Sequence, residues 1–309
     1  MFHVEHSFCK ILGNDLIKRS MLTAVAGGRV SHAYIISGGA GFGKTMLAHA
    51  FAKAALCFSP QGGSTCNACT SCKTYDSGNN PDVVFVSPQK ASFGVDDVRD
   101  NVVADLSILP YSSSRRVYIL SKAHTMTPAA QNALLKSLED GPAHIMFILL
   151  SNGLEAFLPT ILSRAITYKI PPLSQQLVYK FLVDNTIEHE KAKTAAWFCE
   201  GGLGRALKIA TDKDFDLLRQ NILEIAKNIE SMGIVEIFAT ARSLEAYKDD
   251  VHDILSILKL YFRDELIQNQ PRFLAKIDAL DDAKEKLSRN CPFLLCMEIM
   301  LLRLAGIAL

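Results

Sequence analysis

One stretch of the sequence has the residue types and spacing that suit phosphate binding. Residues 38–45 read GGAGFGKT and match the pattern G-x-x-x-x-G-K-[ST]. An apolar segment precedes this loop and a helix-forming segment begins at Met46, which is the strand–loop–helix context that such a loop requires. The predicted nucleotide contacts are Gly38, Gly39, Ala40, Gly41, Phe42, Gly43, Lys44 and Thr45.

Each part of this loop has an expected task. The glycines let backbone N–H groups converge on phosphate oxygens, with the positive end of the following helix behind them. Lys44 is expected to reach the β- and γ-phosphates, and the Thr45 hydroxyl to hold Mg²⁺. The alternative is a glycine-rich turn that binds no ligand.

Four cysteines with metal-ligand spacing follow the loop. They form the pattern C-x8-C-x2-C-x2-C and are Cys57, Cys66, Cys69 and Cys72. Four thiolates suit tetrahedral Zn²⁺ in a closed structural site. The alternatives are disulfides, which a cytoplasmic location disfavours, and free thiols, which the spacing disfavours. The other cysteines stand alone in apolar surroundings and are predicted to be core residues: Cys9, Cys199, Cys291 and Cys296.

A predicted strand at residues 116–120, RVYIL, ends in Ser121 and Lys122. Nucleotide-hydrolysing proteins usually place carboxylates at this point. A hydroxyl is a poorer Mg²⁺ partner than a carboxylate, and an ammonium group cannot accept a proton from water. Because loss of a general base alone costs about 10²–10⁴ in rate, we expect negligible hydrolysis by this chain. ATP or ADP binding remains open, with Mg²⁺ held weakly if at all.

Two nearby residues offer substitutes for the missing carboxylates. His124 is a candidate base, but the alternation of the strand predicts that its side chain points elsewhere, at the entry of the next helix. Lys122 is expected to face solvent. The alternative is that Lys122 neutralises phosphate charge where Mg²⁺ would otherwise lie.

The overall composition restricts the function classes. The chain has 309 residues, 49% of them hydrophobic and 21% charged, and its net charge is +1. No strong field therefore attracts it to nucleic acid or to a membrane, and no apolar run approaches the roughly 20 residues of a membrane span. The first residues lack the pattern of a signal peptide. We expect a cytoplasmic protein without a membrane partner.

Short β-rich segments alternate with helical ones in the first half of the chain. The predicted strands are 34–36, 81–88, 116–120, 144–151 and 165–170. This alternation predicts a parallel sheet with crossover helices on both faces. One helix is well delimited, since Thr127 is placed as its N-cap, Pro128 as its first residue and Gly141 beyond its end.

Taken together, the motifs resemble those of bacterial clamp-loader proteins of the AAA+ class, and among these the delta-prime subunits of DNA polymerase III. The resemblance runs from Phe8 to about Leu207 and rests on the phosphate loop, the cysteine insert and three further segments: GVDDVRD (94–100), NALLKSLEDGPAHIMFILLS (132–151) and LPTILSR (158–164). It implies a RecA-like α/β domain with a parallel sheet, a small helical lid and an all-α collar that joins subunits.

The resemblance also implies roles for single residues. Arg164 matches an arginine finger that reaches a neighbouring subunit's γ-phosphate, although Ala165 replaces the usual Cys; the alternative is a surface arginine. Ser151 and Asn152 end the fourth predicted strand, where a γ-phosphate sensor is expected, and Arg205 matches a lid sensor. Alternatively, Asn152 caps a turn and Arg205 is a solvated helix residue.

Three domains are predicted. A RecA-like P-loop domain covers residues 1–170 and contains the zinc insert (57–72), a helical lid covers 171–210, and a helical collar for oligomerisation covers 211–309. Ser174 is a plausible N-cap of the first lid helix. Leu, Ile and Phe recur at helical spacing beyond Thr211, as in residues 251–267.

Three functions remain open on the sequence. The first is a non-hydrolysing or weakly active subunit of the DNA polymerase III clamp loader, with gamma/tau and delta subunits as partners and the sliding clamp and primed DNA reached through the complex. The second is an autonomous P-loop ATPase that takes its Mg²⁺ carboxylate from Asp96 or Asp97. The third is an ATP-hydrolysing subunit of the gamma/tau type, which Ser121 and Lys122 disfavour.

Overall fold

The computed structural model describes residues 7–90, 92–267, 274–289 and 291–307, so the outer ends of the first and last predicted domains lie outside the described residues. The chain forms two compact units. The first comprises Met1–Lys180 and Glu200–Arg205, and the second comprises Phe181–Cys199 and Ala206–Leu309. The three-part division at residues 170 and 210 stays a prediction.

A five-stranded parallel sheet with the order β2-β3-β4-β1-β5 forms the centre of the first unit. Its strands are β1 (Ala33–Ser37), β2 (Val83–Val86), β3 (Arg116–Leu120), β4 (Ile145–Ser151) and β5 (Ile166–Lys169). The predicted strands are thus confirmed. Every residue of β1 and β4 is buried, as expected for strands that are covered on both faces.

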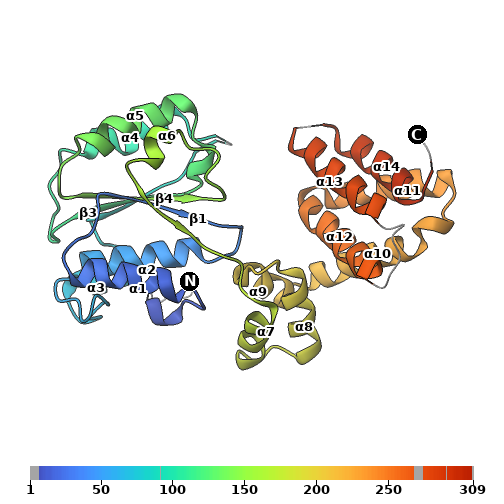
Figure 1. The fold of residues 1–309 in the computed structure, drawn as a ribbon, viewed down its shortest axis with the longest axis horizontal. Helices are drawn as coiled ribbons and strands as arrows, with labels where there is room; N and C mark the ends of the chain where they lie inside the picture. Colours follow the sequence, from blue (N-terminus) through green and yellow to red (C-terminus); the bar gives the residue numbers. More distant parts are fainter. Residues whose placement is uncertain (1–6, 91, 268–273, 290, 308–309) are drawn as a thin grey trace. The chain divides into compact units, whose positions relative to one another are not determined.

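Helices cover both faces of this sheet (Figure 1). One side carries α1 (Asp15–Ala26), α2 (Lys44–Leu56) and α3 (Thr70–Asp76), and the other carries α4 (Val95–Asn101), α5 (Pro128–Glu139) and α6 (Pro159–Leu162). Short 3-10 helices complete the unit: η1 (Phe8–Lys10), η2 (Val103–Asp105) and η3 (Ala123–Thr125). The predicted crossover helices are confirmed.

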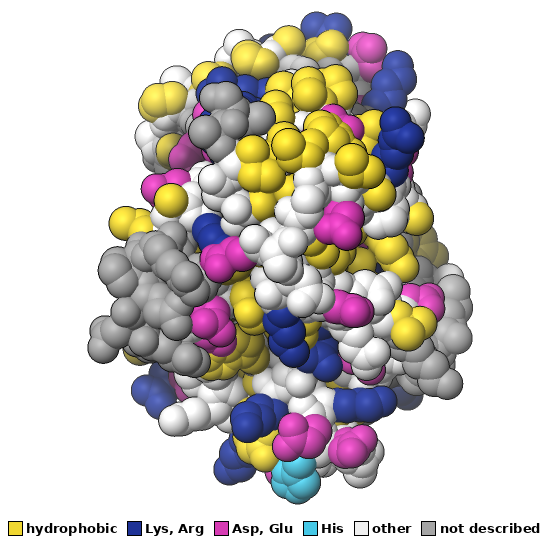
Figure 2. Space-filling view, turned by 90° about the vertical axis from the view of Figure 1, so that its right-hand side faces the viewer, with side chains coloured by type: hydrophobic (Ala, Val, Ile, Leu, Met, Phe, Trp, Pro, Cys, Tyr) yellow, Lys and Arg dark blue, Asp and Glu magenta, His cyan; other side chains and the backbone are white. Residues whose placement is uncertain are grey.

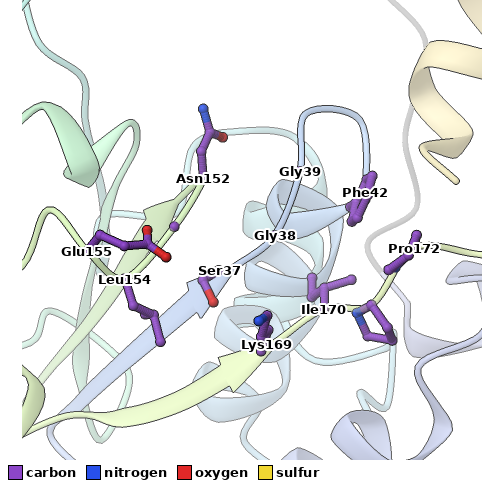
Figure 3. Close-up of a pocket in the computed structure, with 12 residues that line it drawn as sticks. Ser37, Gly38, Gly39, Phe42, Asn152, Leu154, Glu155, Lys169, Ile170 and Pro172 are labelled. Carbon is purple, nitrogen blue, oxygen red and sulfur yellow. The ribbon is translucent and has the colours of Figure 1, made fainter. Parts of the chain in front are cut away.

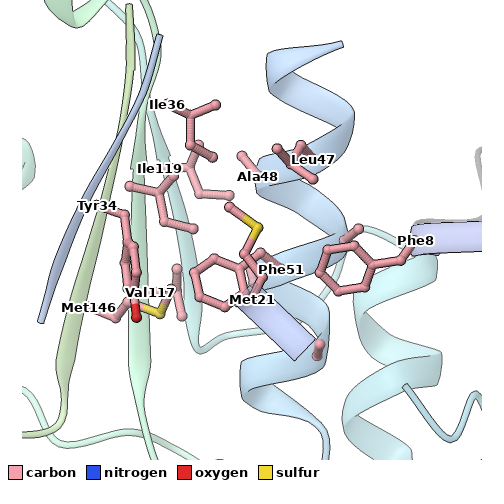
Figure 4. Packing of buried hydrophobic residues seen from close by; sticks show 14 of the residues in the cluster. Phe8, Met21, Tyr34, Ile36, Leu47, Ala48, Phe51, Val117, Ile119 and Met146 are labelled. Carbon is pink, nitrogen blue, oxygen red and sulfur yellow. The ribbon is translucent and has the colours of Figure 1, made fainter. Parts of the chain in front are cut away.

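Two hydrophobic cores hold these layers together. On the α2 side, Ile36 and Ile119 of the sheet pack with Phe51 of the helix (Figure 4). On the α5 side, the alternate strand residues, such as Tyr118, pack with Leu134. Burying one such side chain stabilises the fold by about 1.5–3 kcal/mol, so both cores fix the sheet that positions the loops at its carboxyl edge.

The signals predicted for α5 are confirmed. The Thr127 hydroxyl accepts a hydrogen bond from the Ala130 N–H at 3.2 Å, and Pro128 is the first helical residue. Asp140 is the C-cap, directly before Gly141. The helix therefore begins and ends where the local sequence places its capping residues.

Among the described residues beyond β5, all the regular elements are helices. They are α7 (Gln175–Asp184), α8 (His189–Phe198), α9 (Leu203–Thr211), α10 (Lys213–Asn228), η4 (Ile229–Ser231), α11 (Ile234–Ser243), η5 (Leu244–Asp250), α12 (Val251–Ile267), α13 (Leu274–Ser288) and α14 (Phe293–Leu304). Ser174 accepts a hydrogen bond from the Leu177 N–H at 3.3 Å, which confirms the predicted N-cap. Within the described ranges, no helix has the length and apolar character needed to cross a bilayer.

The prediction that four isolated cysteines belong to the core is half wrong. Cys199 and Cys296 are buried, but Cys9 and Cys291 are exposed. Cys9 lies in a single turn of 3-10 helix that buries only Phe8, and Cys291 precedes the first buried residue of α14. Apolar neighbours in sequence therefore did not bring these two thiols inside.

The buried carboxylate of Asp82 holds a loop of the first unit in place. Its side chain is 1% exposed, and its carboxylate accepts hydrogen bonds from the backbone N–H groups of Tyr111 at 2.5 Å, Ser112 at 3.0 Å and Ser113 at 2.8 Å. Burial acts to raise the pKa of Asp82, but these N–H groups outweigh it and hold the pKa below the ordinary value.

We expect Asp82→Ala to lower the free energy of unfolding by about 2 kcal/mol, because three charge-assisted contacts are lost. Urea titrations should show a constant difference in the free energy of unfolding between wild type and variant from pH 7 down to 3.8, the ordinary pKa of the group. Below that pH the difference should narrow, because the wild-type carboxylate becomes protonated. Asp100→Ala, at an exposed position, is the control. A difference in the free energy of unfolding that does not depend on pH would contradict this role of Asp82.

Candidate functional site

The phosphate loop has the predicted context. β1 ends at Ser37, and α2 begins at Lys44 with Gly43 as its N-cap. Gly41 and Gly43 have φ angles of +76° and +85°, in the left-handed region that side chains other than glycine rarely adopt. The Gly38 N–H donates to the Ser151 carbonyl at 3.1 Å, which ties the start of the loop to the end of β4.

Lys44 is turned onto the loop itself. Its ammonium group donates to the carbonyl oxygens of Gly38 at 2.5 Å and Gly39 at 2.8 Å, and to Asn152 Oδ1 at 3.1 Å. Burial lowers the pKa of Lys44. All three acceptors are neutral, so an anion such as a phosphate would be a stronger partner than any of them. Thr45 is exposed in the next position.

The end of β3 carries no carboxylate, and its two polar residues have other contacts. The Ser121 N–H donates to the Val86 carbonyl at 2.8 Å, and its hydroxyl lies 2.7 Å from the hydroxyl of Ser87. Lys122 is exposed, as predicted, and its φ of +51° is left-handed. This turn ends the strand geometry and leads the chain into η3.

His124 corrects a prediction. It was expected to point away from the site, but its Nδ1 accepts a hydrogen bond from the Asn152 backbone N–H at 3.4 Å, and its Nε2 lies 3.2 Å from Asn152 Nδ2. The left-handed turn at Lys122 interrupts the alternation on which the expectation depended. Burial first, and then the charges of Lys44 and Lys122, lower the pKa of His124.

The two sensor candidates differ in position. The Asn152 side chain contacts both Lys44 and His124. The Ser151 side chain is buried, and its hydroxyl donates to the Gly153 carbonyl within a tight turn. Asn152 is thus the residue whose side chain lies in the phosphate-loop cluster.

A cavity of about 520 Å³ adjoins the loop where β1, β4 and β5 end (Figure 3). Phe42 and Ile170 supply apolar wall, while Asn152, Glu155 and Lys169 supply polar groups. The cavity is therefore open to the loop and of mixed character. Its size suits a small ligand or part of one.

Arg205 lies close to the loop at the start of α9. The Gly204 N–H donates to the Gly41 carbonyl at 3.0 Å, and Arg205 Nη1 lies 3.3 Å from Glu200 Oε2. Its side chain is 15% exposed. The predicted lid arginine therefore belongs to the same neighbourhood as the phosphate loop.

Arg164 lies apart from this cluster, just beyond α6. Its guanidinium forms an ion pair with Glu139 of α5 at 2.8 Å and donates to the Thr160 carbonyl at 3.1 Å. The side chain is 37% exposed. A group held at the surface in this way is accessible to another molecule.

The four predicted metal ligands come together. The sulfur atoms of Cys57, Cys66, Cys69 and Cys72 all lie within 4.8 Å of one another. Backbone N–H groups of the second, third and fourth cysteine each lie 3.4 Å from the preceding ligand sulfur. Hydrogen bonds from the Ala68 and Cys69 N–H groups lower the pKa of the Cys66 thiol to about 6, whereas burial raises the pKa of Cys57 and Cys72. The geometry fits a four-thiolate zinc site.

A buried lysine links this insert to the phosphate-loop helix, which sequence reasoning missed. Lys53 of α2 is 2% exposed, and its ammonium group donates to Asn67 Oδ1 and Asp76 Oδ2, both at 2.8 Å. Its position on the buried face of α2 was the available signal, because a lysine is almost never fully buried without a partner.

Comparison with known proteins identifies the family. Residues 13–174, more than half of the chain, match the family described as DNA polymerase III, delta subunit. The chain belongs to this family. The delta' subunit of Bacillus subtilis DNA polymerase III is 26% identical over 253 residues, covering 81% of this chain and 76% of the relative. The tau subunit of the same organism is 28% identical over 282 residues, covering 84% and 50%.

Other relatives of this DNA polymerase III family are longer than the chain. It spans 27%, 50% and 63% of the length of three gamma and tau relatives, one of them the Mycoplasma pneumoniae gamma/tau subunit at 31% identity over 205 residues, which covers 66% of this chain. A DNA polymerase III gamma subunit-related protein from Thermotoga maritima shares the fold, with a TM-score of 0.53 and 18% identity over 93% of this chain and 98% of that one. The predicted α/β fold class, a parallel sheet with helices on both faces followed by helical segments, is confirmed.

We expect the purified chain to contain about one equivalent of zinc, measured by mass spectrometry of the native protein, because four thiolates form one closed site. Cys66→Ser and Cys69→Ser should each lose it, and a strong chelator should lower the melting temperature of wild type to that of the variants. Cys9→Ser, outside the cluster, is the control. Full zinc content in the Cys66 variant would contradict the assignment.

Proposed function

We propose that this chain is a delta-prime-type subunit of the DNA polymerase III clamp loader that binds a nucleotide, hydrolyses it little or not at all, and supplies Arg164 to a neighbouring ATPase subunit. Its partners are the gamma/tau and delta subunits in the cytoplasm. Through that complex it helps place the sliding clamp on primed DNA. Zinc is a structural component of its cysteine insert.

One observation carries this proposal: an intact phosphate loop faces a β3 end with a hydroxyl and a cation. Lys44 and the glycine conformations support nucleotide binding. Ser121 is paired with Ser87, and Lys122 is exposed, so neither supplies the negative charge that holds Mg²⁺ or the base that activates water.

The alternative of an autonomous ATPase finds no support in its candidate carboxylates. Asp97 Oδ2 accepts a hydrogen bond from the Gly94 N–H at 2.8 Å and so caps α4. Asp96 is exposed on the same helical turn. A hydrolysing subunit of the gamma/tau type is the second candidate, because relatives with those names match this chain. Ser121 and Lys122 argue against this candidate.

Exposed apolar residues in the helical segments suit a surface that contacts another protein. Ile234, Val235 and Phe238 of α11 are exposed by 54%, 82% and 38%. Figure 2 shows hydrophobic side chains gathered in the upper part of the face that it presents. Exposed apolar patches often mark protein–protein contacts, and a collar that joins loader subunits would cover such a surface.

We expect the isolated chain to bind a fluorescent ATP analogue without measurable phosphate release. Lys44→Ala should weaken binding about tenfold or more, since a charge-assisted contact to phosphate is lost. Lys73→Ala, an exposed lysine of α3, is the control. Ser121→Asp with Lys122→Glu should make binding more dependent on Mg²⁺. Sustained ATP turnover by the unmodified chain alone would overturn the silent-site assignment.

We expect Arg164→Ala to assemble normally with the gamma/tau and delta subunits but to slow ATP turnover by the complex. An arginine supplied in trans accounts for about 10³–10⁵ in rate at one site, so the complex should lose nearly all turnover at the interface that receives Arg164. Steady-state phosphate release in the presence of clamp and primed DNA measures this. Arg19→Ala, at an exposed position of α1, is the matched control. Equal turnover of the complexes that carry the two variants would contradict the role of Arg164.

A further inference from the structure

One buried lysine lies between the phosphate-loop helix and the turn that carries two of the cysteine ligands. The Lys53 side chain is 1% exposed, and its ammonium group donates to Asn67 Oδ1 and to Asp76 Oδ2, both at 2.8 Å. Asp76 is the last residue of α3, whereas Asn67 lies inside the insert, between Cys66 and Cys69. Because a buried ammonium group without acceptors is costly, these contacts stabilise the lysine inside the fold.

Asn67 gives the ligand turn an uncommon backbone conformation. Its φ of +54° lies in the left-handed region, which asparagine tolerates better than most residues other than glycine. Its own N–H donates to the Cys72 sulfur, and the Cys69 N–H donates to the Cys66 sulfur at 3.4 Å. The side-chain oxygen of Asn67 has different partners. It accepts from the buried lysine and, at 3.0 Å, from the Thr65 hydroxyl.

We propose that Lys53 is a positioning residue of the zinc site, which holds the left-handed turn at Asn67 and so raises the affinity for the metal. This role rests on the zinc site of the proposed function and is independent of nucleotide binding. The turn brings two ligand sulfurs together and directs its own N–H to a third. A turn that is already held in this geometry loses less conformational entropy when the ion binds.

Metal binding and the burial of Lys53 therefore support each other. Without the ion, the turn can leave its left-handed conformation, and the ammonium group then loses the Asn67 oxygen as an acceptor. By linkage, a contact that forms fully only in the metal-bound protein raises the metal affinity. An ion pair that merely joined α2 to α3 through Asp76 would stabilise the zinc-bound and zinc-free protein equally.

The first arm of the test measures the zinc dissociation constant by competition with a chromophoric chelator. Lys53→Met keeps an unbranched side chain of similar length without the charge and should weaken zinc binding about tenfold or more, as outer contacts of metal sites do. Lys73→Met, at an exposed position of α3, is the matched control and should bind zinc as wild type does. Wild-type zinc affinity in Lys53→Met would overturn the inference.

Co²⁺ in place of zinc provides a spectroscopic readout for the same variants. Lys53→Met should keep the absorption bands of four-thiolate coordination, because the lysine is not a ligand. Loss of these bands would mean that a thiolate ligand is lost, and would overturn a role in positioning alone.

The second arm tests whether the effect passes through Asn67. Asn67→Gly keeps the left-handed backbone accessible but removes the side-chain oxygen, so it should weaken zinc binding as Lys53→Met does. The double variant should be no weaker than the weaker single variant, because both changes remove the same contact. Asn67→Asp keeps an acceptor and should retain the wild-type affinity. Additive losses in the double variant would overturn the inference. If Lys53→Met does not fold, Asn67→Gly, at an exposed position, still decides it.

The third arm compares melting temperatures with zinc and with excess chelator. Lys53→Met should lower the melting temperature of the zinc-bound protein more than that of the zinc-free protein. Equal shifts in the two forms would indicate a structural ion pair alone and would overturn the inference. If wild type binds no zinc, the zinc assignment and this role fail together, whereas Lys44→Ala still tests nucleotide binding.

Discussion

The ammonium group of Lys44 is the charge around which the carboxyl edge of the sheet is arranged. Its partners, two loop carbonyls and the Asn152 amide, come from segments that follow β1 and β4, which pair in parallel with Ser37 opposite Ser151. All three are neutral, the cation Lys122 acts on the neighbouring His124, and Glu155 and Lys169 line the adjoining cavity. In the function proposed above, the ammonium group of Lys44 attracts an anion while no carboxylate at the end of β3 supports Mg²⁺, which would separate nucleotide binding from hydrolysis on electrostatic grounds.

The cysteine insert and the phosphate loop share one helix. α2 begins at Lys44 and has Cys57 as its C-cap, so one cysteine of the cluster and the lysine of the loop lie at opposite ends of 13 helical residues. Lys53 in the same helix is buried against Asn67 of the insert and Asp76 at the end of α3. The ion pair with Asp76 offsets the charge of this buried ammonium group, which would be costly to bury alone. The insert thereby fixes the helix that presents Lys44.

Features that local sequence patterns determine could be predicted from the sequence. The phosphate loop, the four-cysteine spacing and the caps of α5 each depend on residues within a few positions of one another, and the structure has them as predicted. Features that depend on an unexpected backbone conformation or on tertiary packing could not be predicted. His124 enters the site only because Lys122 adopts a left-handed conformation, and Cys9 is exposed because its helical turn buries Phe8 alone. The partners of Lys53 lie 14 and 23 positions away in the sequence.

The contacts of Arg164 are weak, so little free energy would be lost if its guanidinium left them for a neighbouring subunit, as proposed. Its ion pair with Glu139 joins two side chains that are 37% and 43% exposed, and such surface pairs contribute only about 0–1 kcal/mol. The pair is strong enough to keep the guanidinium near the end of α6 and too weak to compete with a triphosphate, whose oxygens accept bidentate hydrogen bonds from arginine. A chain whose β3 end has no carboxylate and no base can therefore still offer a positive charge to a neighbour, because the two features lie on separate elements and neither depends on the other.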